Sequence, residues 1–500
     1  MFLVPRTHSK TWIVATILLA MMLTALDMTI VGTAMPSIIA SLHGVSLYSW
    51  VFSAYLLTST TPVPIYSKLA DMYGRKPVFL AGAALFTVGS ALCGAAVNMP
   101  ELILFRALQG LGAAGVLPVA LTIVGDLFTL EQRGRVQGLF SAVWGLAAVV
   151  GPLAGAWIVE NTSWRWVFEI NLPIGLLVLL ILWRTFHEVI ARRPHDIDLV
   201  GAGLMSAAVV LVMAALLQTA WSPSLRSATG LAGLALLAGF LVWETRAPEP
   251  VLPLAIFRDR LIALSSVVNL AAGMLMFGLI SYLPLFVQTV QGGTPTMAGR
   301  AITPMMVAWP ITAFGVSPLL MRVGHRRVAV AGGLMIAAGA LGVAWGVSAS
   351  PLVLGIGTAL VGSGMGLSLT GLLITLQGAV PWNLRGVVTG TTQFFRTIGG
   401  AIGVAAMGAL FNQNTMALAA ATPSLHAFSF SRLTTVLIVP HLRAALPPEV
   451  RNTIVSIMGQ SLHAVFLLGI GFAALVLVSV LGLPAAKPSP AEQPLAEEAF

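Results

Sequence analysis

The stretch Ser67–Pro77, SKLADMYGRKP, is the most specific pattern in the chain and separates two long apolar runs. Gly74 allows backbone angles that other residues rarely adopt, and the final proline suits the opening of a helix. Asp71 and Arg75 place opposite charges four positions apart. A solvated basic loop would explain Arg75 and Lys76, but not the whole eleven-residue pattern. The stretch therefore predicts a tight, charged turn between two long helices.

The composition is that of an integral membrane protein. Hydrophobic residues make up 57% of the chain and charged residues only 9%, whereas soluble domains contain about a quarter charged residues. The net charge of +9 does not indicate nucleic-acid binding, because the basic residues lie in short loops between apolar runs. Cys93 is the single cysteine, which excludes an internal disulfide and a cysteine-cluster metal site.

Fourteen apolar runs predict membrane-spanning helices. They lie at about 12–34, 48–66, 77–97, 101–124, 136–159, 166–183, 199–219, 228–243, 261–287, 299–320, 327–347, 351–376, 387–411 and 461–483. Arg6, His8 and Lys10 before the first run resemble the start of a signal peptide. The run is too long for a signal peptide and no clear cleavage site follows, so we expect a retained first helix.

The distribution of Lys and Arg tests this count, because one missed helix would invert every later loop. With the N-terminus inside, the expected cytoplasmic segments carry 18 of the 26 Lys and Arg residues and the outer segments carry 6. The remaining two, Arg106 and Arg396, lie within helices. The sequence thus predicts a multi-pass protein of the cytoplasmic membrane with both termini in the cytoplasm.

We expect an all-α polytopic membrane protein of two six-helix bundles with two helices inserted between them. The expected parts are a bundle at 1–183, linkers at 184–260 with helices at about 199–219 and 228–243, and a bundle at 261–483. Residues 412–460 alternate apolar with polar residues around three prolines and predict an outer loop with short surface helices. That loop is either a connector or a cap over the substrate path. Residues 484–500, rich in Pro, Ala and Glu, predict a disordered cytoplasmic tail.

Asp27 is a carboxyl group inside the apolar run from Trp12 to about Ala34. At about 1.5 Å per helical residue it lies about 22 Å from the helix start, inside a hydrocarbon layer about 30 Å thick. Such a group persists where it faces a water-filled cavity, pairs with a cation or takes up a proton. The alternative is an acid that only hydrogen-bonds a neighbouring helix. We favour the functional interpretation because intramembrane acids are scarce.

Arg106 is a second charged group within an apolar run, in the stretch Leu102–Gly112. It lies about 8 Å inside the outer end of its helix. Asp27, counted from the cytoplasmic start of its own helix, lies at a similar depth in the membrane. The two side chains can therefore meet. A guanidinium would favour the charged form of the carboxyl and removal from water would favour the neutral form, a balance that suits proton exchange. An inert buried ion pair is the alternative.

The stretch Gly145–Ala156 combines small residues with a proline inside one helix. Small residues allow close approach of neighbouring helices, and Pro152 removes a backbone hydrogen bond and bends the helix. Taken alone, the stretch would be ordinary packing between membrane helices.

Together, Ser67–Pro77, Leu102–Gly112 and Gly145–Ala156 resemble three motifs of the major facilitator superfamily. The first resemblance implies a cytoplasmic latch, in which Asp71 faces a helix terminus of the opposite half and Arg75 pairs with Asp126. The second implies a role for Arg106 in proton coupling. The third implies a helix bend that marks antiporters rather than importers, formed by Gly145, Gly151, Pro152 and Gly155. The chain departs from the motifs at Ser67 and at Ala156, where the family has glycine.

Leu26–Pro36 and Ser163–Gly175 resemble signatures of the fourteen-helix drug:proton antiporters, the multidrug and antiseptic efflux family. Gly32 replaces the Asn that the family usually has, and Glu169 replaces an apolar or aromatic residue. Glu169 is either a second acid that contacts cationic substrates or a solvated side chain at the helix boundary. Arg322–Arg327 is only a remnant of the cytoplasmic loop motif. Arg396, with its neighbouring glycines, resembles a pattern that the drug:proton antiporters carry late in the chain. It either contacts substrate or serves helix packing.

We therefore expect a monomeric transporter that exports amphipathic small molecules in exchange for protons. Asp27 and Arg106 are the proton-coupling pair, and Met28, with Glu169 and Arg396, is a candidate substrate contact, since methionine re-packs readily. A dedicated exporter of one metabolite, siderophore or amino acid and a non-transporting receptor or scaffold are the alternatives. No cofactor is expected beyond the proton gradient, no metal site and no nucleic-acid partner. Enzyme function lacks support, because no catalytic grouping, metal-binding His pair or phosphate-binding loop is present in the sequence.

Overall fold

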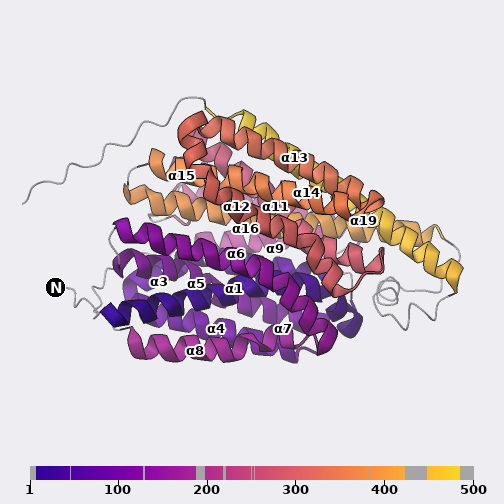
Figure 1. The fold of residues 1–500 in the computed structure, drawn as a ribbon, viewed down its shortest axis with the longest axis horizontal. Coiled ribbons are helices and arrows are strands. Elements are labelled where there is room, and N and C mark those ends of the chain that lie inside the picture. The colour runs from indigo at the N-terminus through magenta and orange to yellow at the C-terminus, as the bar shows by residue number, and fades with distance from the viewer. Residues whose placement is uncertain are drawn as a thin grey trace, which may run out of the picture. The chain divides into compact units, whose positions relative to one another are not determined.

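The computed structural model describes residues 7–44, 47–127, 130–186, 198–217, 221–248, 250–252, 254–380, 382–422 and 447–484, and every regular element within them is helical (Figure 1). The first ten helices are α1 (Thr7–Leu42), α2 (Tyr48–Thr60), α3 (Val63–Tyr73), α4 (Arg75–Ala95), α5 (Met99–Leu127), α6 (Leu130–Asn161), α7 (Trp166–Glu169), α8 (Asn171–Thr185), α9 (Leu199–Leu217) and α10 (Pro223–Glu244). A 3₁₀ turn, η2 (Leu254–Arg258), leads to α11 (Arg260–Thr289), α12 (Pro295–Val323), α13 (His325–Ala349), α14 (Pro351–Met365), the π-helical turn η3 (Gly366–Thr370), α15 (Gly371–Ala379), α16 (Trp382–Ala420) and α19 (Pro448–Leu481).

Within the described residues, 12 segments are long and apolar enough to cross a membrane. The other two expected runs differ in form. The run at 48–66 is divided into α2 and α3, and the apolar part of α6, Gly145–Asn161, is shorter than a full span. The total of fourteen spanning helices therefore stays a prediction.

The segment Ser67–Pro77 is more helical than its glycine and charges suggest. Helix α3 continues through it to Tyr73, and the Gly74 amide donates to the Ala70 carbonyl oxygen. The turn is confined to Gly74, whose φ of 98° lies in the region that only glycine adopts without strain. Helix α4 then begins at once with Arg75.

The expected outer loop at 412–460 is also shorter than the sequence suggests. Helix α16 continues to Ala420, and α19 begins at Pro448. The polar side chains of Asn412 and Thr415 are buried in this continuation of α16, so their polarity does not mark a loop. Residues 423–446, and the expected tail after Pro484, lie outside the described residues.

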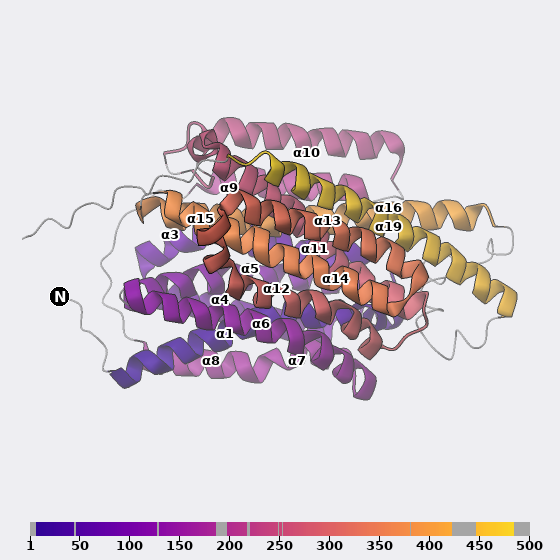
Figure 2. The same cartoon turned by 45° about the horizontal axis from the view of Figure 1, so that its top comes forward.

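The chain forms two compact units, and each is described by itself. Unit 1 comprises Met1–Val251, Gly278–Thr303 and Val404–Val465, and unit 2 comprises Leu252–Phe277, Pro304–Gly403 and Phe466–Phe500. In unit 1, α1 packs against α6 and α8, α5 packs against α2 and α4, and α9 pairs with α10, as Figure 2 shows for the last pair. In unit 2, α13 packs against α14 and η3. The predicted division at 184–260 rests on chain order and stays a prediction.

Candidate functional site

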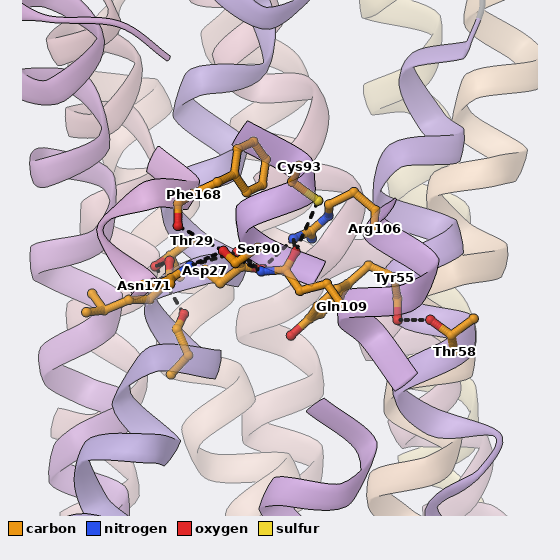
Figure 3. A network of polar contacts seen from close by, with 12 residues as sticks. Asp27, Thr29, Tyr55, Thr58, Ser90, Cys93, Arg106, Gln109, Phe168 and Asn171 are labelled. Atoms are coloured by element: carbon orange, nitrogen blue, oxygen red, sulfur yellow. Dashed lines mark hydrogen bonds and ion pairs between the residues drawn. The ribbon is translucent and has the colours of Figure 1, made fainter. Parts of the chain in front are cut away.

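The interior of unit 1 contains a charged pair surrounded by hydrogen bonds (Figure 3). Asp27 of α1 and Arg106 of α5 are each 1% exposed, and Arg106 Nη1 donates to Asp27 Oδ2 over 2.5 Å. The predicted approach of the two side chains is confirmed. Because so little of either group reaches solvent, their attraction is not screened as a surface pair would be.

Gln109 connects the two charged groups. Its Oε1 accepts from Arg106 Nη1 at 2.7 Å, and its Nε2 donates to Asp27 Oδ1 at 2.9 Å. The position of Gln109 depends on close approach of α4 and α5, since a Cβ on Gly89 would lie 2.6 Å from the Gln109 Cα. A side chain at residue 89 would therefore displace this part of α5.

A second layer orients the amides. Asn171, the first residue of α8, donates to Ser90 Oγ at 2.9 Å and reaches Asp27 Oδ1 at 3.5 Å. Ser90 Oγ of α4 donates in turn to the Phe168 carbonyl oxygen at 2.9 Å. Four helices, α1, α4, α5 and α8, thus contribute to one polar network (Figure 3).

The Arg106 guanidinium also contacts aromatic rings. Its Cζ lies 4.0 Å from the centroid of the Tyr55 ring of α2 and 5.9 Å from that of Phe168. Rings at this range attract a cation. These contacts supply Arg106 with partners that do not depend on the charge of Asp27.

The network suits a deprotonated Asp27. Each group that reaches its oxygens, from Arg106, Gln109 and Asn171, is a donor. A protonated carboxyl is neutral and a weaker acceptor, so uptake of a proton weakens the charge-assisted contact with Arg106. The site can therefore couple the charge of one side chain to the packing of several helices.

The helix 5 motif brings α6 close to α1. A Cβ on Gly151 would lie 1.9 Å from Thr29 Oγ1, and a Cβ on Gly155 would lie 2.5 Å from Thr33 Oγ1. The Thr29 hydroxyl lies 3.2 Å from the Ala147 carbonyl oxygen. Pro152 is inside α6, and Gly145 is partly exposed. Thr29 follows Asp27 by two residues, so the bent helix lies beside the acid-bearing segment of α1.

The predicted latch is only partly within the described side chains. Gly74 makes the turn between α3 and α4, and Lys76 Nζ donates to the Trp183 carbonyl oxygen at 2.7 Å, near the end of α8. Arg75 is partly buried. The side chains of Asp71 and Asp126 lie outside the described part of the chain, so the predicted contacts of these two acids stay predictions.

Within the described part of unit 1, the candidate substrate contacts Met28 and Glu169 make no hydrogen bond to the network. Glu169 ends α7, and its Cγ and Oε1 would lie 3.2 and 3.5 Å from a Cβ on Gly94. Met28 is partly buried beside Asp27 in α1. Arg396 belongs to unit 2 and is described with that unit. Among the described residues, no three His, Cys, Asp or Glu side chains are grouped as a metal site would require.

Sequence reasoning missed the neutral members of the site. Gln109 is three residues after Arg106 on the same helix, a spacing that puts both on one face. Asn171 is a polar residue at the opening of a helix, two positions after Glu169. Both residues lie within the motifs described above. An uncharged amide does not indicate its partner or its role until the positions of the helices are known.

Within unit 1, hydrogen bonds also connect helices that are far apart in the sequence. These bonds lie at the end of the helices that the distribution of Lys and Arg predicts to face outward. Ser49 Oγ of α2 lies 2.5 Å from Tyr282 OH of α11, and the Tyr48 hydroxyl donates to the Ser281 carbonyl oxygen. Gln288 Nε2 donates to the Thr33 carbonyl oxygen at 3.3 Å. These hydrogen bonds tie α1 and α2 to α11.

Glu160 makes a similar connection between α6 and α12. Its Oε1 accepts from the Thr296 amide at 2.9 Å, and its Oε2 accepts from the Thr296 hydroxyl at 2.8 Å. Burial acts to raise the pKa of Glu160, but the hydrogen bonds from Thr296 and the charge of Arg300 outweigh it and lower the pKa. The carboxylate thus caps the first turn of α12 from outside that helix.

Comparison with known proteins places the chain in a family. The family model of the Major Facilitator Superfamily matches residues 17–404. The chain is 39% identical over 414 residues to the multidrug transporter protein MdtP of Bacillus subtilis, covering 81% of this chain and 76% of that protein. It is 33% identical over 488 residues to multidrug resistance protein 3 of the same organism, covering 95% of each.

A solved structure has the same fold. The bacterial homologue of the human lysosomal transporter Spinster, in an inward-facing and occupied conformation, superposes with a TM-score of 0.71 at 16% identity, covering 97% of this chain and 100% of that one. The resemblance at this identity concerns the fold alone. The family match and the identity to curated transporters show that the chain belongs to the Major Facilitator Superfamily and is a transporter rather than an enzyme.

Proposed function

We propose that this transporter exports amphipathic drugs or similar small molecules across the cytoplasmic membrane in exchange for protons, and that Asp27 carries the exchanged proton. The observation that carries the proposal is the buried pair of Asp27 and Arg106, in which all three partners of the acid are donors. The relatives named for multidrug transport and resistance support the substrate class. The branch expected is the fourteen-helix drug:proton antiporters.

The exchange follows because a proton competes with Arg106 and Gln109 for the carboxylate of Asp27. In the deprotonated form the carboxylate is bound by Arg106 and Gln109, which holds α1 against α5. A proton arriving from the outer side neutralises the acid and weakens that contact, while Tyr55 and Gln109 still hold the guanidinium. The helices then repack, and release of the proton on the cytoplasmic side restores the pair. Each entering proton gains about 2.3 kcal/mol per 100 mV of membrane potential.

Alternating access needs the outer contacts to open. The hydrogen bonds of Ser49 with Tyr282 and of Glu160 with Thr296 join helices of the first and second halves of the sequence. Release of a substrate to the outside would require these contacts to separate. The bend in α6 at Pro152, packed on α1 through Gly151, would transmit movement of the α1 segment that carries Asp27.

Transport into everted membrane vesicles tests the proposal. Ethidium, a fluorescent amphipathic cation, is added outside vesicles whose interior is made acidic. We expect gradient-dependent accumulation by the wild-type protein and none by Asp27→Asn at equal protein level, because an amide cannot exchange a proton. The matched control is Asp259→Asn, since Asp259 is exposed and caps the start of α11, a role that Asn fills equally well.

The other outcomes decide between functions. Accumulation that persists after the gradient is collapsed would contradict proton coupling and indicate facilitated diffusion. Absence of movement across a broad panel of drugs would favour a dedicated exporter of one metabolite, siderophore or amino acid.

A further inference from the structure

Unit 2 contains a cation that the proton-coupling scheme does not use. Arg396 lies on α16, 14 residues after Trp382, or about 21 Å along the helix and so at the depth of the hydrocarbon layer. Its Nη2 donates to Gln393 Oε1, and its Cζ lies 5.5 Å from the centroid of the Trp309 ring. No carboxylate within the described residues pairs with it. An arginine at this depth stays charged, so it needs a polar or anionic partner.

The guanidinium lines a small polar cavity. The cavity has a volume of about 60 Å³, and its polar lining comes from Asn269, Thr370, Thr389, Thr392, Gln393 and Arg396. Among the described residues, the lining has amide and hydroxyl groups around one positive charge and no acidic residue. A drug-sized molecule needs several hundred Å³, whereas this volume suits one carboxylate or a few water molecules.

The backbone beside the cavity is unusual. The helix that continues α14 changes to a π-helical turn at Gly366–Thr370, and Leu369 and Thr370 from this turn line the cavity. Such turns are rare and occur frequently at functional sites. The turn packs tightly on α12, because a Cβ on Gly366 would lie 2.6 Å from the carbonyl oxygen of Trp309, the residue whose ring contacts Arg396.

We propose that this cavity binds the carboxylate of an amphipathic organic acid, with Arg396 as the residue that recognises it. A guanidinium and a carboxylate form a charge-assisted pair with two parallel hydrogen bonds, and Gln393 and Trp309 hold the guanidinium on one edge and one face. The apolar body of the acid lies outside the cavity, which is too small for it. The inference rests on the proposed export function and adds organic anions to its substrates.

The charge of Arg396 excludes the opposite class from this subsite. The guanidinium would repel a cationic drug, so a cation would bind elsewhere. Export of a monoanion against entry of one proton also moves two positive charges inward. Transport of an acid would therefore respond to membrane potential more steeply than transport of its neutral analogue.

Equilibrium binding tests the subsite without any gradient. The full-length protein is placed in nanodiscs of uncharged phosphatidylcholine, and the probes are 1-pyrenebutyrate and its neutral amide. We expect the wild-type protein to bind the acid more tightly than the amide by about tenfold or more. We expect Arg396→Gln to lose that preference while affinity for the amide is kept. Arg226→Gln is the matched control, since Arg226 is also partly buried, and its Nε donates to the Ala215 carbonyl oxygen in the α9 and α10 pair.

Three results would overturn the subsite. The first is equal affinity of the wild-type protein for acid and amide, a comparison that needs no variant. The second is an acid affinity in folded Arg396→Gln within about twofold of wild type. The third is displacement of the acid by phosphatidylglycerol together with absence of transport of the acid, which would identify a lipid headgroup site. Binding is measured without a gradient, so failure of proton coupling in the vesicle assay and failure of the subsite in the binding assay are distinguishable.

Discussion

At the scale of single residues, the site depends on neutral amides as much as on charges. Gln109 accepts from Arg106 and donates to Asp27, so one side chain satisfies both charged groups in a buried position. Hydrogen bonds to charged groups contribute about 1.5 to 3 kcal/mol each, more than neutral ones. Gln109 is therefore expected to set the geometry in which the acid gains and loses its proton.

Replacement of Gln109 by Leu removes both hydrogen bonds with little change in volume. We expect gradient-driven export to fall by about tenfold or more, a change of about 1.4 kcal/mol, because the pair loses its bridge. The measurement is initial rate of uptake into everted vesicles at matched protein level. Gln460→Leu is the control, since Gln460 is exposed on α19 and donates to Ser456 Oγ. Equal rates for Gln109→Leu and wild type would show that the bridge is dispensable.

The meeting of Asp27 and Arg106 was predictable because helical rise converts residue number into depth. The identity of their other partners was not. Ser90 and Asn171 join the network only after α4 and α8 are placed beside α1, and one sequence carries no signal of rotation about a helix axis. The aromatic contact from Tyr55 to Arg106 depends on placement in the same way.

At the scale of elements, the contact between α1 and α6 leaves no room for a side chain. Gly151 faces the Thr29 hydroxyl and Gly155 faces the Thr33 hydroxyl, each closer than a Cβ tolerates. The motif in α6 thus fixes a distance between two helices, one of which carries Asp27. This close packing explains why small residues recur there beside a proline that bends the helix.

Gly151→Ala tests that contact. The added methyl group would lie 1.9 Å from Thr29 Oγ1, so α1 and α6 must separate. Overpacking of this kind destabilises by about 1 to 3 kcal/mol, which we expect to appear as a lower unfolding temperature of the purified protein. The matched control is Gly203→Ala in α9, where nothing lies within 4 Å of an added Cβ. A shift no larger than that of the control would contradict the packing account.

Element boundaries were harder to predict than element positions. The charged stretch Ser67–Pro77 suggested a loop, but its residues continue α3 until Gly74 provides a positive φ. Likewise residues 412–460 suggested an outer loop, but Asn412 and Thr415 at its expected start are buried within α16. Polarity marks exposure to water only when the neighbouring helices are known, and in both places packing overrides it.

At the scale of the whole molecule, the side on which the segment between α9 and α10 lies depends on whether this pair crosses the membrane. If both helices cross the membrane, every later loop stays on its predicted side, and 18 of the 26 Lys and Arg residues lie on the cytoplasmic side. Both helices are long and apolar enough to cross a membrane. Because the two helices form a pair, every later loop keeps its predicted side if both cross or neither does, and α9 and α10 decide only the side of the segment between them.

Cysteine labelling tests the predicted arrangement. We expect Ser222→Cys, between α9 and α10, to react with a membrane-impermeant maleimide in intact cells. Thr245→Cys, after α10, should react only after permeabilisation, because it lies on the cytoplasmic side. The native Cys93 is fully buried and serves as the unlabelled background. Reaction of both positions, or of neither, in intact cells would show that the pair does not cross the membrane.

The most direct test of the central claim is proton release on substrate binding. The purified protein is held in weakly buffered detergent solution with a pH-sensitive dye, and saturating ethidium is added. We expect the wild-type protein, acidified beforehand so that Asp27 has taken up its proton, to release up to about one proton per chain, because a single acid sits in the network of donors. Asp27→Asn should bind ethidium and release none. Equal proton release by wild type and Asp27→Asn would contradict the assignment of the exchanged proton to Asp27.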